Sequence, residues 1–403
     1  MVRMVETAPV SATRRSSAAR LAALAAALTG CGAVPTYAVT TCQGLGVAED
    51  RTDILFVVDD SGSMFDKQEN LAANFTSFIT RLAASPARND LQIGVTTTSV
   101  DRYGLGLFPD TFAATGACLS PPSLGQPYPQ GALVSVSGPD VAVDRLQSTT
   151  APPRILSGAS PTLVADFSEN VAVGVCGSGR EQGLAGARLA LSDPNLSGPN
   201  AGFLRSGARL AVVIVSDDDD CSDPDHTGAS EEPPDCTHYP VEGYVDFFSG
   251  PIGGETKDLY VAVIGAVDPA TLEPSACIEE PSGAQAEHPA YRYKAFVDAF
   301  GSRGLIDSVC NPSFANTLAA IASQISQEVA LSAAPADPRL LSVSVVHPDG
   351  SRQACSVKEA GDAEAADVTY LAPSGSRPPS LEFGGSCLLE AGDQVEVSLL
   401  CVG

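Results

Sequence analysis

An apolar run that ends abruptly in acids and hydroxyls constrains this chain most. Asp53 to Val58 reads Asp-Ile-Leu-Phe-Val-Val, and Asp59-Asp60-Ser61-Gly62-Ser63 follows directly. A near-continuous apolar run of this kind predicts a strand buried on both faces of a parallel sheet. Residues 67–84 then carry apolar side chains at helical spacing. The acids therefore lie where a buried strand gives way to a helix.

This strand end offers oxygen ligands in a tight turn. Asp59, Ser61 and Ser63 stand at alternate positions, and Gly62 permits the turn between the two serines. One carboxylate and two hydroxyls suit a hard divalent cation, Mg²⁺ or Ca²⁺. An alternative remains open at this point, because Asp59 and Ser61 are also residue types that cap helices.

A second strand end of the same kind favours the metal. The run 210–215 is the most apolar in the chain, and Ser216-Asp217 ends it. Open parallel sheets form their sites beyond the carboxyl ends of the strands. Two acids at the same edge would repel each other unless a cation lay between them.

With both strand ends considered, residues 50–330 resemble a von Willebrand factor A-type (VWA) domain with a metal-ion-dependent adhesion site, whose motif is DxSxS. The resemblance implies that Asp59, Ser61 and Ser63 bind the metal and that Asp217 completes the site, usually through water. The alternation of predicted strands and helices, like the family, implies an α/β fold: a doubly wound, mostly parallel, Rossmann-like sheet flanked by helices.

The chain departs from this family pattern at one ligand. The family uses a threonine from the loop before a central helix, and here residues 177–183 contain none. Glu181 is the first candidate to replace it and Ser178 the second. The alternative is that Glu181 is no ligand and is simply an acid at the start of a helix, where the helix dipole favours negative charge. A direct carboxylate would make the metal a weaker acceptor for a ligand and would favour Ca²⁺ in principle.

The predicted organisation has four parts. Residues 1–30 combine four arginines with a short apolar run and predict a signal peptide. The sequence Leu28-Thr29-Gly30-Cys31 resembles a bacterial lipobox, which predicts a lipid on Cys31; ordinary secretion with an incidental cysteine is the alternative. We then expect a stem over 31–50, a VWA domain over 51–332 with a loop insertion at about 100–165, and a small β-rich region over 338–403.

The net charge and the cysteines indicate which partners and which cellular compartment suit the chain. The net charge is −25, and removal of residues 1–30 would leave 19 bases and 47 acids. Such an excess argues against nucleic acid as a partner. Lipidation of Cys31 would leave ten of the eleven cysteines, for which disulfides are expected in an exported chain. Nearest-neighbour pairing would join 118–176, 221–236 and 277–310, so that 42, 355, 387 and 401 would include a bridge from the stem to the C-terminal region.

The acidic loop 217–240 has two interpretations: an additional Ca²⁺ site, or a solvated loop closed by a disulfide. Nothing in the sequence matches an enzyme motif, and no general base is identifiable. We therefore expect a non-enzymatic binding or adhesion module, lipid-anchored to the bacterial cell envelope, with the outer membrane favoured. Its partner would be an extracellular or periplasmic protein that offers an Asp or Glu to the cation. The alternatives are a structural envelope lipoprotein whose metal only stabilises it and, less favoured, a metal-dependent hydrolase.

Overall fold

The computed structural model describes residues 39–47, 50–83, 89–100, 128–135, 153–223, 240–279, 284–286, 288–374, 378–390 and 392–402. The predicted signal peptide, Cys31, half of the stem and most of the predicted insertion lie outside these residues. Among the described residues, none forms a helix long and apolar enough to cross a membrane.

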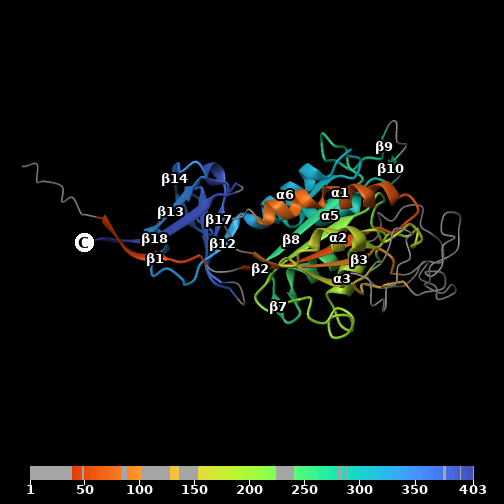
Figure 1. Cartoon of the computed structure of the whole chain (residues 1–403), viewed down its shortest axis with the longest axis horizontal. Coiled ribbons are helices and arrows are strands. Elements are labelled where there is room, and N and C mark those ends of the chain that lie inside the picture. Colours follow the sequence, from red (N-terminus) through yellow and green to blue (C-terminus); the bar gives the residue numbers. More distant parts are fainter. Residues whose placement is uncertain are drawn as a thin grey trace, which may run out of the picture. The chain divides into compact units, whose positions relative to one another are not determined.

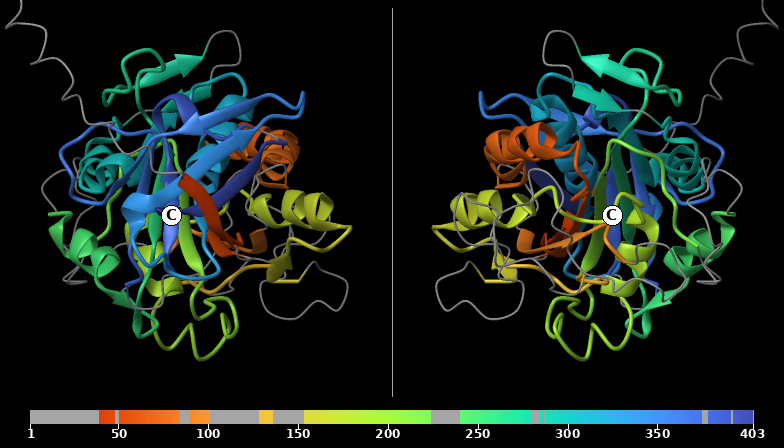
Figure 2. Two further views of the ribbon diagram at one scale, coloured as in Figure 1. Left: turned by 90° about the vertical axis from the view of Figure 1, so that its left-hand side faces the viewer. Right: turned by 90° about the vertical axis from the view of Figure 1, so that its right-hand side faces the viewer.

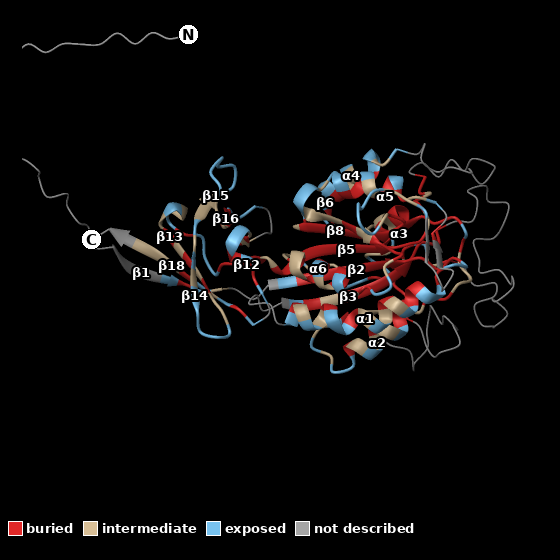
Figure 3. Cartoon of the chain, turned by 90° about the horizontal axis from the view of Figure 1, so that it is seen from above, coloured by how far each residue is buried: buried red, intermediate tan, exposed pale blue. Residues whose placement is uncertain are grey.

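The largest sheet has six strands in the order β11-β8-β5-β2-β3-β4. Its first five strands run parallel, and β4 pairs antiparallel with β3 at the edge. β5 and β8 are buried along their whole length, which matches their unbroken apolar sequences (Figure 3). The strands are β2 (Asp50–Val58), β3 (Asn89–Thr97), β4 (Ile155–Ser157), β5 (Arg209–Val215), β8 (Leu259–Gly265) and β11 (Gly304–Ser308).

Helices cover both faces of this sheet. Figure 2 shows α1 and α2 on one side and α4 and α5 on the other, and α6 lies beside α1 (Figure 1). Phe56 of β2 packs edge-to-face against Phe75 and Phe78 of α1 and against Phe167 of α2, which fixes the strand beneath its polar end. The helices are α1 (Phe65–Ala83), α2 (Leu163–Val171), α3 (Gly183–Ala190), α4 (Glu242–Ser249), α5 (Tyr291–Asp298) and α6 (Ala315–Ser326).

The predicted fold class, a doubly wound, mostly parallel, Rossmann-like VWA sheet with a small β-rich region, is wrong. The described residues form a mixed α/β structure with six α-helices and five sheets, and antiparallel pairs occur in every one of the five. The physical reason is that long buried parallel strands give the strongest apolar signal. Short antiparallel strands that are partly exposed leave a weak one.

Two four-stranded sheets account for much of this difference. Their orders are β1-β18-β13-β14 and β12-β17-β16-β15. In β13 the sequence alternates between buried and partly exposed residues, as a strand with one solvated face requires. The strands are β1 (Val39–Leu45), β12 (Glu328–Ala330), β13 (Leu341–Val346), β14 (Arg352–Cys355), β15 (Val357–Glu359), β16 (Val368–Leu371), β17 (Ser380–Phe383) and β18 (Gln394–Val402). Two short hairpins, β6 (Pro251–Ile252) with β7 (Glu255–Thr256) and β9 (Cys277–Glu279) with β10 (Ala284–Ala286), complete the sheets.

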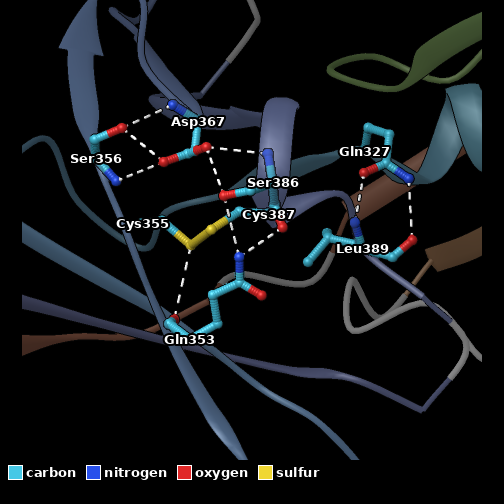
Figure 4. The surroundings of a disulfide bond; sticks show 8 residues. All are labelled: Gln327, Gln353, Cys355, Ser356, Asp367, Ser386, Cys387 and Leu389. Carbon is cyan, nitrogen blue, oxygen red and sulfur yellow. Dashed lines mark hydrogen bonds between the residues drawn. A yellow bond between two sulfur atoms is a disulfide. The ribbon is translucent and has the colours of Figure 1, made fainter.

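A disulfide joins Cys355 at the end of β14 to Cys387 (Figure 4). Beside it, the Asp367 carboxylate accepts hydrogen bonds from the backbone N–H and hydroxyl of both Ser356 and Ser386, at 2.7–3.1 Å. Cys176, Cys221 and Cys310 are disulfide-bonded as well. The expectation of disulfides is confirmed for these five cysteines.

Candidate functional site

The acids predicted to share one edge of the six-stranded sheet do meet there. β2 and β5 pair in parallel with Val58 opposite Val215, so the residues that follow each strand emerge side by side. The Asp59 backbone N–H donates to the Val215 carbonyl at 2.9 Å, which extends the pairing by one residue. Asp59 and Asp217 are thereby placed at the same edge by the sheet register itself.

The carboxylate of Asp59 is held from three directions. Its Oδ1 accepts the backbone N–H of Ser61 at 2.8 Å and the hydroxyl of Thr98 at 3.4 Å, while its Oδ2 accepts the hydroxyl of Ser216 at 2.7 Å. The side chain of Gln68 in α1 donates to the Asp59 carbonyl at 2.8 Å. Contacts from three strand ends therefore hold the carboxylate, and α1 holds the backbone of the same fully buried residue.

The two serines of the motif form a path from Asp59 to Asp217. The hydroxyls of Ser61 and Ser63 are 3.5 Å apart, and the Ser63 hydroxyl donates to Asp217 Oδ1 at 3.0 Å. Asp217 is 1% exposed, whereas Ser63 is exposed. The row of oxygens thus runs from the buried interior to the surface.

Glu181 approaches from the loop before α3. It is buried, and the charges of Asp59 and Asp217 act on it. Its backbone carbonyl accepts the N–H of Cys221 at 2.6 Å, which ties this loop to the segment after β5. The hydroxyl of Ser178 accepts the N–H of Arg180 at 3.1 Å. The charges of Asp59, Asp218 and Asp217 all raise the pKa of Glu181, so this candidate for the missing threonine's place lies within the electrostatic reach of the other acids.

We call Asp59, Glu181 and Asp217 the acidic cluster. Burial raises the pKa of Asp59 well above its ordinary range, and the charge of Asp217 raises it further. Burial likewise raises the pKa of Glu181, with the charge of Asp59 as the next cause. Burial also raises the pKa of Asp217, although the nearby Lys67 ammonium and the Ser63 hydrogen bond oppose that rise. Three carboxyls are thus crowded in a site that disfavours their charges.

Lys67 is the cation that the sequence reasoning missed. It lies in the first turns of α1 and is 3% exposed. Its Nζ donates to the Ser63 carbonyl at 3.0 Å and forms ion pairs with Asp217 Oδ2 and Asp66 Oδ1, each at 3.3 Å. The sequence offered one sign of this contact: a lysine four residues after Ser63, in the helix that follows the motif. Thr98 was also missed, although a run of hydroxyls after the buried strand β3 marks it.

The neighbouring acids have a structural role, because groups of the chain itself donate hydrogen bonds to their carboxylates. Asp60 accepts the Ser99 hydroxyl at 2.7 Å. Asp219 accepts the backbone N–H of Arg292 at the start of α5, at 3.0 Å. Asp220 accepts the N–H of Leu184 in α3 at 3.0 Å and pairs with the Arg292 guanidinium at 2.8 Å. Asp219 and Asp220 are therefore buried structural acids, which neither interpretation of the acidic loop expected.

The structure describes only part of the rest of that loop. Residues 224–239, with His226, His238 and Cys236, lie outside the described part of the chain. His288 contacts Asp218 through Nδ1 at 3.0 Å, and His347 contacts Asp393 at 2.8 Å. These contacts account for the two histidines that the structure describes.

The donor set fits a divalent cation in its chemistry. Within the described residues, no three His, Cys, Asp or Glu side chains gather tightly enough to form a ready metal site. Serine hydroxyls can also bind a cation, however. The oxygen pairs Ser61–Ser63 and Ser63–Asp217 are separated by 3.5 and 3.0 Å, and adjacent ligands of an octahedral Mg²⁺ lie roughly 3 Å apart. Asp217 Oδ2 is ion-paired with Lys67 Nζ at 3.3 Å, so Oδ1 is the Asp217 oxygen that faces the serines. These residues could hold Mg²⁺ or Ca²⁺.

No protein-family model and no curated protein matches the chain. Among solved structures, it is similar to the pilus adhesin SpaC from Lactobacillus rhamnosus GG in its open conformation, with a TM-score of 0.36 and 10% identity over 90% of this chain and 40% of that one. Proximal thread matrix protein 1 from the mussel byssus gives 0.33 and 10% over 78% and 52%. The human COPII-coat protein Sec24c gives 0.29 and 7% over 88% and 44%.

The chain thus spans between two fifths and about half of these solved chains. All three TM-scores lie below 0.5, so these similarities assign neither a family nor a function to the chain. The resemblance to a VWA domain therefore stays a prediction.

Proposed function

We propose that this chain is a non-enzymatic binding module of the bacterial cell envelope that contacts a protein partner through a divalent cation. Asp59, Ser61, Ser63 and Asp217 would hold the cation as in a VWA-type adhesion site, with Glu181 beside them. The cation would supply a positive acceptor for a carboxylate of the partner. Both the chain and such a carboxylate are anionic, so a cation is what makes the contact favourable.

The observation that supports this proposal most is the crowding of the acidic cluster. Burial raises the pKa of all three carboxyls; the charge of Asp217 also raises the pKa of Asp59 and Glu181, and the charge of Asp59 raises that of Glu181. The Lys67 ammonium is the counter-charge of Asp217. Burying like charges is costly unless a cation compensates them. A bound Mg²⁺ or Ca²⁺ would remove that cost.

The surface around Ser63 supports contact with a partner. Ser63 is exposed although the acids behind it are buried, so the oxygen row reaches solvent at this residue. Phe65, two residues further on, exposes 54% of its surface at the start of α1. An exposed aromatic side chain beside a polar site is typical of binding surfaces.

The proposed location outside the cytoplasm rests on the disulfides. Five described cysteines are oxidised, and disulfides persist in exported proteins. The lipid on Cys31 belongs to the same proposal, and radiolabelled palmitate in cells tests it. We expect label in the native chain and none in Cys31→Ser; equal labelling of both would contradict an anchor at this residue.

The central experiment separates cation binding from partner binding. Calorimetric titration of EDTA-treated protein with Mg²⁺ and with Ca²⁺ should show one site, which Ser63→Ala weakens. An array of peptides bearing Asp or Glu should then retain the protein with cation present and release it in EDTA. Retention that survives EDTA would refute a metal-bridged contact. Cation binding without peptide retention would favour a purely stabilising metal, and turnover of phosphoester or peptide substrates would revive a hydrolase.

A further inference from the structure

Lys67 divides the Asp217 carboxylate into two unlike halves. Oδ1 accepts the Ser63 hydroxyl at 3.0 Å, so it lies beside the proposed ligands. Oδ2 accepts no hydrogen bond, and its ion-pair partner is Lys67 Nζ at 3.3 Å. One oxygen thus faces the candidate site and the other faces the ammonium.

The position of Lys67 is fixed by more than Asp217. Its Nζ also donates to the Ser63 carbonyl at 3.0 Å and lies 3.3 Å from Asp66 Oδ1. The side chain is almost fully buried within α1, so it has little freedom to move away from the acidic cluster. An ammonium held in this way excludes any other cation from Asp217 Oδ2.

This matters for the choice of ion because Mg²⁺ and Ca²⁺ use carboxylates differently. Ca²⁺ takes six to eight oxygens and often binds a carboxylate through both of its oxygens. Mg²⁺ requires octahedral geometry, keeps several waters, and binds one oxygen of a carboxylate. A carboxylate with one oxygen already occupied by an ammonium suits the smaller ion. Glu181 acts in the opposite direction, because an added negative charge favours Ca²⁺ in principle.

We infer that Lys67 is a specificity-determining residue of the candidate site: by occupying Asp217 Oδ2 it restricts Asp217 to single-oxygen coordination and favours Mg²⁺ over Ca²⁺. The inference rests on the proposed function, since it requires that a divalent cation binds at Asp59, Ser61 and Ser63, and it requires further that Asp217 Oδ1 binds that cation directly and not through water. Lys67 itself touches neither partner nor metal, and acts by positioning Asp217.

The test compares Kd values for Mg²⁺ and Ca²⁺ in four proteins by calorimetry. Lys67→Met removes the ammonium at similar length, and Lys67→Arg keeps a cationic donor. Lys257→Met is the matched control, because Lys257 is also buried and ion-paired, to Glu255 at 3.3 Å, but lies before β8 at the other end of the strands. Outer-shell partners change metal affinity by about 10–100-fold.

We expect Lys67→Met to shift the ratio of the two Kd values toward Ca²⁺ by at least about tenfold. Lys67→Arg and Lys257→Met should keep the native ratio within about threefold. If Lys67→Met does not fold, as judged by circular dichroism, Lys67→Ala removes the same ammonium and leaves space for water. Suppose that the native protein binds both cations and that Lys67→Met, or Lys67→Ala in its place, leaves the ratio of the two Kd values unchanged. That result overturns the inference alone. A native protein that binds neither cation overturns the proposed function, and the inference falls with it.

Discussion

Replacing Asp59 with Asn should stabilise the cation-free protein and abolish its response to cations. Asp59 is fully buried, and burial together with the Asp217 charge raises its pKa well above the ordinary range. A raised pKa in the folded state means that the ionised carboxylate costs stability, and that the cost grows as the pH rises. Asn has nearly the same shape and carries no charge.

The local contacts tolerate this change. Oδ1 of the Asn can still accept the Ser61 N–H, now at 2.8 Å, and the Ser216 hydroxyl, now 2.7 Å from Oδ2, can rotate to accept the new amide N–H. A folded pKa above the ordinary value costs about 1.4 kcal/mol for each pH unit between the two, until the carboxyl takes up a proton at the working pH. We therefore expect Asp59→Asn to be more stable than the native chain by at least about 1 kcal/mol at pH 7 in EDTA.

The cation response has the opposite sign. A cation at one hundred times its Kd stabilises the native chain by about 2.7 kcal/mol. In a domain of this size that raises the Tm by roughly 5–10 °C. Asp59→Asn should show almost none of this rise, because the central ligand has lost its charge. The assay is thermal unfolding in EDTA and in excess Mg²⁺ or Ca²⁺, supported by urea titration.

Asp53→Asn is the matched control at the opposite end of β2. Asp53 is equally buried, but its two oxygens accept the backbone N–H and the Nε–H of Arg205, both at 2.7 Å. An amide there would set one N–H against another donor, so we expect a loss of about 1–3 kcal/mol and an unchanged response to cations. The reasoning is refuted if Asp59→Asn is no more stable than the native chain in EDTA, or if cations still stabilise it.

Three further predictions concern residues that are not proposed metal ligands. Cys355→Ser should lower the free energy of unfolding by about 3–4 kcal/mol in a urea titration, because the bridge to Cys387 closes a segment of sequence separation 32; a loss under about 1 kcal/mol would contradict this. The hydrogen bonds from two serines lower the pKa of Asp367, so its contribution to stability is present above pH ~4 and lost as the pH falls through the lower folded value. Asp367→Asn should therefore flatten the loss of stability between pH 5 and 2 (roughly the range of carboxylate titration), and an unchanged acid profile would count against that account. In Gly177→Ala the new Cβ would lie 2.2 Å from Asp60 Cγ, so we expect a loss of about 1–3 kcal/mol in thermal unfolding, and native stability would show that the loop yields freely.

The meeting of the candidate ligands could be predicted because it depends on local signals. An apolar run that stops at an acid marks a buried strand end, and two such ends, at Asp59 and Asp217, imply a shared edge if the strands are parallel. The register of β2 and β5 and the hydrogen bond from Ser63 to Asp217 follow that logic. Metal binding itself is not tested by these contacts and stays a prediction.

Other features depend on contacts that no local pattern encodes. In sequence, Lys67 is a charged residue in an amphipathic helix, and such a residue normally faces solvent. Its burial follows from the position of α1 over the end of β5, which only the tertiary structure determines. The fold class failed for a related reason. Short strands such as β15 and β12 gain their identity from long-range partners, β16 and β17, and not from their own three residues.

The run of four acids from Asp217 to Asp220 shows why a charge pattern cannot be interpreted as a unit. Each successive backbone position after β5 points its side chain to a different environment. Asp217 meets Ser63 and Lys67, Asp219 accepts backbone N–H groups at the start of α5, and Asp220 pairs with Arg292. The carboxylates of Asp219 and Asp220 accept hydrogen bonds from the chain itself, so they require no bound cation. Asp217 is ion-paired with Lys67, yet its charge raises the pKa of the buried Asp59 and Glu181. Under our proposal the cation would therefore bind beside Asp59, Glu181 and Asp217, and a net charge of −25 for the whole chain does not identify these acids.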